Sequence, residues 1–215
     1  MGYPIVLTNL QAARCVIVGG GQVAERKVEA LLECGAQVVV VSPTVTERLQ
    51  GWALEGHLVH IARAFEAGDL DGALLVFAAT NSREVNASVA RAGRELRSLV
   101  NVTDDPLAGD FHTAAAVRQG DLLLVVSTGG ASPAVAALVR RKLLTMFGPE
   151  YAKLLELLGA LRPRVLQEVP PRERPYIWRG LATDEVLGWL RAGDSERARV
   201  YAEELIARVK TAPDV

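Results

Sequence analysis

The glycines at positions 19 to 21 carry the strongest chemical signal in the chain, because with the residues after them they form the pattern GxGxxA. Gly19 permits a tight turn, Gly21 lets the backbone approach a pyrophosphate, and the small Ala24 lets a helix pack closely on the preceding strand. The backbone N–H groups near Gln22 and Val23 then face the phosphates, with the helix dipole behind them. The pattern therefore predicts a dinucleotide site.

The strand after this turn ends in VVVVSP and has no acidic residue about 20 positions beyond the glycines, where one would bind the ribose hydroxyls. No arginine follows the strand directly to hold a 2′-phosphate, since the nearest, Arg48, lies a turn into the next helix. We therefore expect NAD as the cofactor, with its ribose held by the backbone and Thr44 and with Pro43 among its contacts.

A hydride-transferring enzyme needs a group that accepts or gives a proton beside the nicotinamide, which in this fold lies beyond the carboxyl ends of the strands. Thr80 and Asn101 reach that edge and are expected cofactor contacts, with a structural turn as the alternative for Asn101. Asp104 and Asp105 reach it too, and at most one of two neighbouring side chains on extended backbone faces the cleft. Asp105, which precedes Pro106, also suits a turn-forming role. The alternative for both aspartates is a solvent-exposed turn with no catalytic role.

The elements that must position these residues alternate between strand and helix over the first hundred residues, which indicates βαβ units on a parallel sheet. The expected strands are 15–19, 37–41, 57–61, 73–79 and 99–102, and the expected helices are 22–34, 44–55 and 82–97. The sequence therefore predicts an α/β fold with a Rossmann-like parallel sheet domain.

The alternation of strand and helix patterns ends after residue 102. A hairpin is expected from 112–117 and 122–126, and then a helix from Ser132-Pro133 to Phe147. Beyond Tyr151 the pattern indicates helices only, interrupted by a proline-rich break over 163–175. We expect three parts: the sheet domain over 1–112, a small α+β region over 113–149 and a helical domain over 150–215.

Composition limits the possible partners. The 215 residues include 24 basic and 25 acidic side chains, so the net charge of −1 gives no general attraction to nucleic acid or to a membrane surface. No stretch reaches the roughly 18 apolar residues of a membrane span. Cys15 and Cys34 stand where core residues are expected, which predicts two buried thiols in a reducing compartment and a cytoplasmic protein.

Four motifs together resemble the precorrin-2 dehydrogenase/sirohydrochlorin ferrochelatase family, which is also found as the N-terminal module of siroheme synthase. They are VGGGQVAERK (18–27), FAATN (77–81), LVNVTDDP (99–106) and STGGASP (127–133). The resemblance covers about residues 1–150 in unbroken order, and the helical remainder matches only in size and position.

The resemblance implies NAD-dependent oxidation of precorrin-2 to sirohydrochlorin and, in bifunctional members, insertion of ferrous iron as a second substrate to give siroheme. It also implies a homodimer, with 113–149 as the dimerisation region. The family's catalytic aspartate falls on Asp104, which would accept the proton lost as hydride leaves and later take pyrrole N–H protons as the metal enters. No residue spacing indicates a stored metal.

The tetrapyrrole substrate carries eight carboxylates, so a protein of near-zero net charge must bind it through a local group of donors. The loop before the Pro133 helix offers hydroxyls and backbone N–H groups for this purpose. The expected substrate contacts are Ser127, Thr128, Gly129, Gly130 and Ser132. Helix capping is the alternative for Ser132.

Two other functions are kept as alternatives. A dehydrogenase without chelatase activity would make sirohydrochlorin and NADH but would not accelerate metal insertion. A regulatory NAD-sensing module would bind the cofactor without turnover, although such modules usually keep the acidic ribose residue that is absent here. Reduction of bound NAD on addition of substrate distinguishes an enzyme from a sensor.

Overall fold

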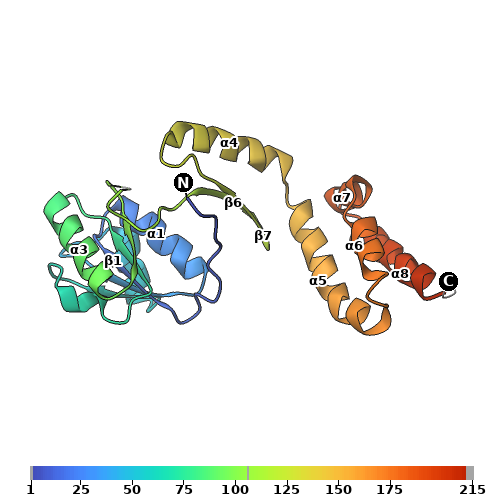
Figure 1. Ribbon diagram of the computed structural model, residues 1–215, viewed down its shortest axis with the longest axis horizontal. Coiled ribbons are helices and arrows are strands. Elements are labelled where there is room, and N and C mark those ends of the chain that lie inside the picture. Colours follow the sequence, from blue (N-terminus) through green and yellow to red (C-terminus); the bar gives the residue numbers. More distant parts are fainter. Residues whose placement is uncertain (1, 106, 212–215) are drawn as a thin grey trace. The chain divides into compact units, whose positions relative to one another are not determined.

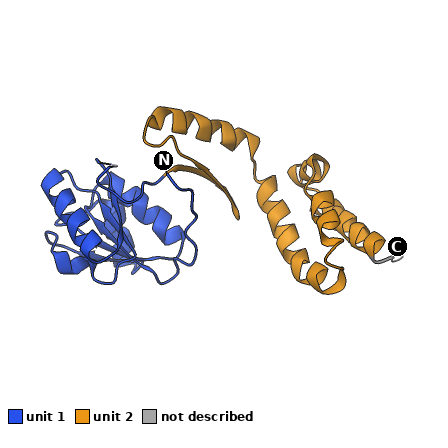
Figure 2. Ribbon diagram, in the orientation of Figure 1, with its two compact units in different colours: residues 1–113 blue, residues 114–215 orange. Residues whose placement is uncertain are grey.

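The computed structural model describes residues 2–105 and 107–211. The chain divides into two compact units, a sheet unit over residues 1–113 and a hairpin–helix unit over residues 114–215 (Figure 2). The further division at residue 149 stays a prediction.

The sheet unit contains a parallel five-stranded sheet in the order β3-β2-β1-β4-β5, which confirms the expected Rossmann-like arrangement. Figure 1 shows β1 of this sheet between α1 and α3. The strands are β1 (Arg14–Val18), β2 (Gln37–Val41), β3 (Leu58–Ile61), β4 (Leu75–Ala78) and β5 (Leu99–Val102). The connecting elements are α1 (Gln22–Glu33), α2 (Glu47–Leu54), the short 3₁₀ helix η1 (Ala67–Leu70) and α3 (Arg83–Glu95). The strand order reverses at β1, so the crevice expected to bind a ligand opens at the carboxyl end of that strand.

Both faces of the sheet are covered, which explains why the central strands are almost continuously apolar. One core joins α1 and α2 to side chains such as Ile17, Val40 and Phe77. The other joins α3 and η1 to side chains such as Val16 and Val76 on the opposite face. The strands are thereby buried on both faces, and the loops at their carboxyl ends start from this core.

The outer edge of β5 is covered by the segment after the aspartate turn. The Asp110 N–H donates to the Val100 carbonyl at 2.7 Å, and the Val100 N–H donates to the Asp110 carboxylate at 2.9 Å. Gly109 runs so close to β5 that an added Cβ would lie 3.0 Å from the Val100 carbonyl oxygen. This return holds the chain beyond β5 against the sheet, although Pro106 of the DDP turn lies outside the described residues.

Two expectations for this unit are wrong in detail. The helix expected from Thr44 begins at Glu47, with Thr46 as its N-cap, because the chain bends at residues 43 and 44 and then packs Thr44 and Val45 on Gly20. Cys34 is exposed, while Cys15 is fully buried. The buried side of α1 passes through Val28 and Leu31, but the helix ends at Glu33, and Cys34 is its C-cap with a backbone that is no longer helical.

The hairpin–helix unit begins with the antiparallel hairpin β6 (Ala115–Gln119) and β7 (Leu122–Val126), followed by α4 (Pro133–Met146). Its remaining helices are α5 (Glu150–Glu168), α6 (Arg174–Leu181), α7 (Asp184–Arg191) and α8 (Ser195–Thr211). The hairpin and α4 are joined by the Arg140 guanidinium, which donates to the Ala116 carbonyl at 2.8 Å. The later helices share cores of their own.

The expected proline-rich break at 163–175 is wrong in extent. Pro163 lies inside α5, which continues to Glu168, and Arg174 already begins α6. A proline inside a helix costs about 3 kcal/mol. The neighbouring Leu161 and Val165 are buried against α6 and α8, and this tertiary packing offsets that cost.

The apolar side chains of α4 are not covered within the chain: none of its residues is buried. Among the described residues, no helix is both long enough and apolar enough to cross a membrane. The same residues include no cluster of three or more His, Cys, Asp or Glu side chains arranged to hold a metal ion.

Candidate active site

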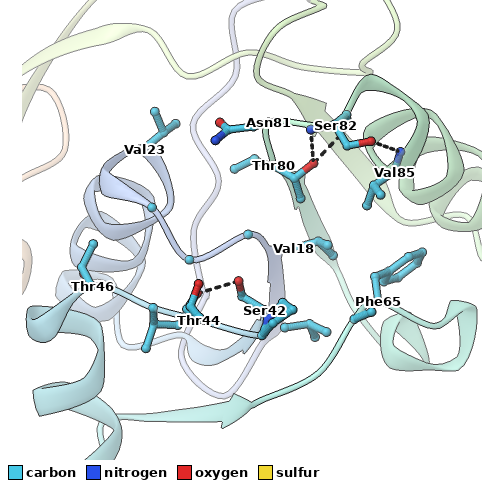
Figure 3. A pocket seen from close by; sticks show the side chains of 18 of the residues that line it. Val18, Val23, Ser42, Thr44, Thr46, Phe65, Thr80, Asn81, Ser82 and Val85 are labelled. Carbon is cyan, nitrogen blue, oxygen red and sulfur yellow. Dashed lines mark hydrogen bonds between the residues drawn. The ribbon is translucent and has the colours of Figure 1, made fainter.

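A cavity of about 770 Å³ opens at the carboxyl ends of β1, β2 and β4 (Figure 3). The expected cofactor contacts among its lining residues are Gly19, Gly21, Gln22, Val23, Pro43, Thr44 and Thr80. Lining residues outside the expected cofactor contacts include Gly20, Ser42, Thr46, Phe65, Asn81 and Ser82. Figure 3 shows Ser42 and Thr44 on one side of the glycine turn and Thr80, Asn81 and Ser82 on the other.

The three glycines of the turn have different tasks. Gly19 has a φ of +121°, and a Cβ on it would lie 2.3 Å from the Ala79 carbonyl oxygen. A Cβ on Gly20 would lie 2.1 Å from the Thr44 carbonyl oxygen, whereas one on Gly21 would meet nothing within 4 Å. Gly19 and Gly20 therefore let neighbouring backbones pack together, and Gly21 keeps the mouth of the cavity open.

The first turn of α1 has no side chain to cap it. Its N-cap residue is Gly21, and no side chain accepts a hydrogen bond there. The first N–H groups of a helix have no partner within the helix, so at this position they are available to an anion. Gln22 and Val23 both line the cavity, as the glycine pattern predicts for pyrophosphate binding.

The loop after β2 is fixed by its own hydrogen bonds. The Ser42 hydroxyl donates to the Thr44 carbonyl at 2.7 Å. The Thr46 hydroxyl donates to the Glu25 carboxylate at 2.6 Å and accepts from the Leu49 N–H. These bonds tie the loop expected to hold the ribose to α1 and to the start of α2.

Arg48, the first cationic residue after β2 in the sequence, is bound to acidic neighbours. Its guanidinium pairs with the Glu25 carboxylate at 3.6 Å and with the Glu29 carboxylate. It also stacks over the Trp52 ring at 4.6 Å. These contacts hold its charge on the surface formed by α1 and α2.

Asp104 lies at the end of β5 and is exposed, but one carboxylate oxygen has a specific partner. Oδ1 of Asp104 accepts from Nδ2 of Asn86 at 2.9 Å. The Asn86 amide is also bonded to Thr80, which lines the cavity. The structure thus joins the expected catalytic carboxylate to the rim of the cofactor site through one side chain.

Asp105 acts differently from its neighbour, as expected for two adjacent side chains. Its Oδ1 accepts from the N–H groups of Leu107 and Ala108, at 3.1 and 3.3 Å. Asp105 therefore stabilises the turn, and Asp104 alone of the pair contacts Asn86.

Asn101 does not line the cavity. Its Nδ2 donates to the Phe111 carbonyl at 2.8 Å, which helps to hold the returning segment on β5. Its Oδ1 is buried without a hydrogen-bond partner among the described residues. The structural role is therefore observed, and the expected contact with the cofactor stays a prediction.

Lys27 lies close to the same returning segment. Its ammonium lies 5.2 Å from the centre of the Phe77 ring, and it donates to the Thr113 hydroxyl at 3.2 Å. The Phe77 ring meets the Phe111 ring edge-on at 5.4 Å. Burial among these groups lowers the pKa of Lys27, with the charge of Arg26 as a smaller cause.

The expected substrate loop, residues 127–132, lies in the hairpin–helix unit and is bonded internally. Ser132 caps α4 by accepting from the Val135 N–H at 3.2 Å, so its predicted capping role is confirmed. The Thr128 hydroxyl accepts from the Ser132 N–H, and the Ser127 hydroxyl accepts from the Gly129 N–H. Binding of substrate by this loop stays a prediction.

Comparison with protein families divides the chain into three consecutive matches. Residues 6–115 match the family described as putative NAD(P)-binding, which is about half of the chain. Residues 119–146 match the central region of a sirohaem biosynthesis protein, and residues 150–206 match the sirohaem synthase dimerisation region. That dimerisation region follows the segment 113–149 in which the sequence predicts a dimer contact.

Known proteins resemble the chain over nearly its whole length. The siroheme synthase of Methylococcus capsulatus is 38% identical over 213 residues, covering 97% of this chain and 45% of that protein. Siroheme synthase 3 of Aeromonas hydrophila is 35% identical, covering 96% of this chain and 45% of that protein. The chain thus spans about half the length of these curated relatives.

The solved structure of a protein named "SirC, precorrin-2 dehydrogenase" shares the fold with a TM-score of 0.79. It is 24% identical in sequence, and the match covers 94% of this chain and 100% of that one. The family matches run in one order along the chain, and the GxGxxA turn lies at the expected edge of the sheet. The chain therefore belongs to the precorrin-2 dehydrogenase and siroheme synthase family that its four motifs resemble.

Proposed function

We propose that this protein oxidises precorrin-2 to sirohydrochlorin with NAD, in the synthesis of siroheme. The observation that carries the proposal is the chain of hydrogen bonds from Asp104 through Asn86 to Thr80. It holds a carboxylate beside a cavity whose glycine turn suits a dinucleotide. A binding-only module has no need of such a carboxylate, and the names of the relatives agree with the proposed reaction.

The residues of the cavity fit a dinucleotide. The open space at Gly21 and the uncapped first turn of α1 provide room and N–H donors for a pyrophosphate. We infer NAD rather than NADP, because Arg48 is already paired with Glu25 and Glu29. A 2′-phosphate would have to displace those carboxylates to bind Arg48.

Asp104 supplies the proton chemistry in this proposal. NAD, when bound, accepts the hydride that leaves the tetrapyrrole. The Asp104 carboxylate takes the proton lost in the same oxidation, so that precorrin-2 and NAD give sirohydrochlorin, NADH and a proton. Ferrous iron enters as the substrate of a proposed second step, in which the carboxylate would receive pyrrole N–H protons.

Anaerobic formation of NADH from NAD and enzymatically prepared precorrin-2 tests the proposal. Because a positioned general base contributes about 10²–10⁴-fold, Asp104→Ala should lower kcat by about 100-fold or more while NAD binding is kept. Asp105→Ala is the matched control, since that neighbour only stabilises the turn. NAD binding without NADH formation by the unmodified protein would favour the sensor alternative, and ferrous iron added afterwards tests the chelatase step spectroscopically.

We also infer a homodimer, because the hairpin and α4 leave apolar side chains uncovered within the chain. Val125, Val135, Leu138 and Met146 are among them. Leu138→Asp should shift the protein toward monomer in light scattering. Leu96→Asp in the sheet unit is the control, because both leucines are 45% exposed. Equal behaviour of the two variants would contradict a dimer contact at α4.

A further inference from the structure

A buried side chain on α3 connects the cofactor cavity to the carboxylate. Asn86 is 1% exposed, and asparagine in a helix interior is neutral to unfavourable unless its amide has partners. Its Oδ1 accepts from the Thr80 N–H at 3.1 Å and from the Thr80 hydroxyl at 2.8 Å. Its Nδ2 donates to the Thr80 carbonyl at 3.1 Å and to the Asp104 carboxylate at 2.9 Å.

The orientation of the Asn86 amide is dictated by these partners. A backbone N–H can only donate, so the Asn86 oxygen must face the Thr80 N–H. A backbone carbonyl and an ionised carboxylate can only accept, so the Asn86 nitrogen must face Thr80 and Asp104. Both amide hydrogens are therefore used, and a flipped side chain would lose three of the four contacts, because only the Thr80 hydroxyl can either donate or accept.

We propose that Asn86 is a positioning residue that holds the Asp104 carboxylate in place relative to the cofactor rim. The inference rests on the proposed dehydrogenase function, in which Asp104 is the proton acceptor. Asp104 is exposed and lies on a turn, so without this bond its carboxylate would sample several rotamers. A displacement of about 1 Å in a catalytic group can cost about 100-fold in rate.

The substitution Asn86→Asp keeps two of the four contacts of the side chain. The carboxylate keeps an acceptor for the N–H and the hydroxyl of Thr80. It replaces the amide donor by a second acceptor, so the bonds to the Thr80 carbonyl and to Asp104 are lost. We expect kcat for NADH formation to fall by at least about 10-fold, while the KM for NAD changes by less than about 3-fold.

Val89→Ala is the matched control. Val89 lies one turn further along α3, is fully buried and packs in the apolar core on that face of the sheet. It should lower Tm through the cavity that it leaves, with kcat unchanged. A wild-type kcat in Asn86→Asp, or an equal loss of kcat in Val89→Ala, would overturn the inference.

Side-chain amide NMR gives a second readout that needs no turnover. The two Nδ2 protons of Asn86 should exchange slowly with solvent, and their resonances should move in Asp104→Ala but not in Asp105→Ala. Identical Asn86 resonances in both variants would also overturn the inference. Absence of NADH with the unmodified protein would refute the proposed function alone, because the NMR comparison still decides whether Asn86 holds Asp104.

Discussion

Two glycine-rich loops precede helices in this protein, and they differ in how their helix ends are satisfied. The loop before α1 has Gly21 at the N-cap and no side chain that caps the first turn. The loop before α4 has Ser132 at the N-cap, and its hydroxyl accepts from the Val135 N–H. The first loop lines a cavity of dinucleotide size.

The glycines of the two loops also differ in their surroundings. Gly19 and Gly20 are packed against backbone carbonyls, at distances that exclude a side chain. Gly129 and Gly130 have positive φ angles, but a Cβ on either would meet nothing within 4 Å. Similar composition therefore serves the close packing of neighbouring backbones in the first loop and a left-handed backbone conformation in the second.

Of the substitutions in the two loops, Gly20→Ala should have the largest effect on stability and on NAD binding. Its Cβ would lie 2.1 Å from the Thr44 carbonyl oxygen, so the loop after β2 would have to move. Overpacking of this kind typically costs about 1–3 kcal/mol, occasionally more, and here it also displaces the cavity wall. We expect a lower Tm together with loss of measurable NAD binding by calorimetry. NAD binding as tight as in the wild type would show that the glycine turn and the loop after β2 can move apart without loss of the cofactor site.

Gly21→Ala should affect binding but not folding. The new Cβ meets no protein atom and the backbone at this position is extended, so the fold tolerates it. The methyl group enters the space through which a pyrophosphate would approach, so we expect the Kd for NAD to rise by about 10-fold, equivalent to about 1.4 kcal/mol. Tm without NAD should change little, and an unchanged Kd would place the phosphates elsewhere.

Gly129→Ala, in the loop before α4, should lower stability slightly and leave NAD binding unchanged. Gly129 has a φ of +63°, which costs a residue with a side chain about 1 kcal/mol or somewhat more. No clash accompanies this strain, so denaturant unfolding should show a smaller loss than in Gly20→Ala. NAD binding should be unchanged, and a loss as large as that of Gly20→Ala would refute the distinction.

Ser132→Ala should have the smallest effect. Removing the cap of α4 leaves the Val135 N–H without its partner, at a cost of about 1 kcal/mol. Ser132→Asp, which keeps an acceptor at the N-cap, should recover most of that stability. If neither variant changes stability but both weaken substrate binding, the hydroxyl serves the substrate rather than the helix.

The sequence alone was sufficient for the parallel sheet and for most of the glycine turn. These features depend on local patterns: apolar runs for the buried strands, a strand–glycine–helix order for the turn, and Ser132-Pro133 for the start of a helix. Asp104 was singled out by its place at a strand end and by the family motif. Its exposure and neighbours were beyond what those patterns contain.

Tertiary structure decided the rest, because the relevant partners are distant in sequence. Asn86 and Asp104 are 18 residues apart, and the pairing of β4 with β5 and the packing of α3 bring them together. The need for glycine at position 20 arises from the Thr44 carbonyl, which belongs to another loop. Pro163 remains helical because its neighbours are buried against other helices. Local propensity is a weak guide at such positions, since burial and hydrogen bonding between distant segments outweigh it.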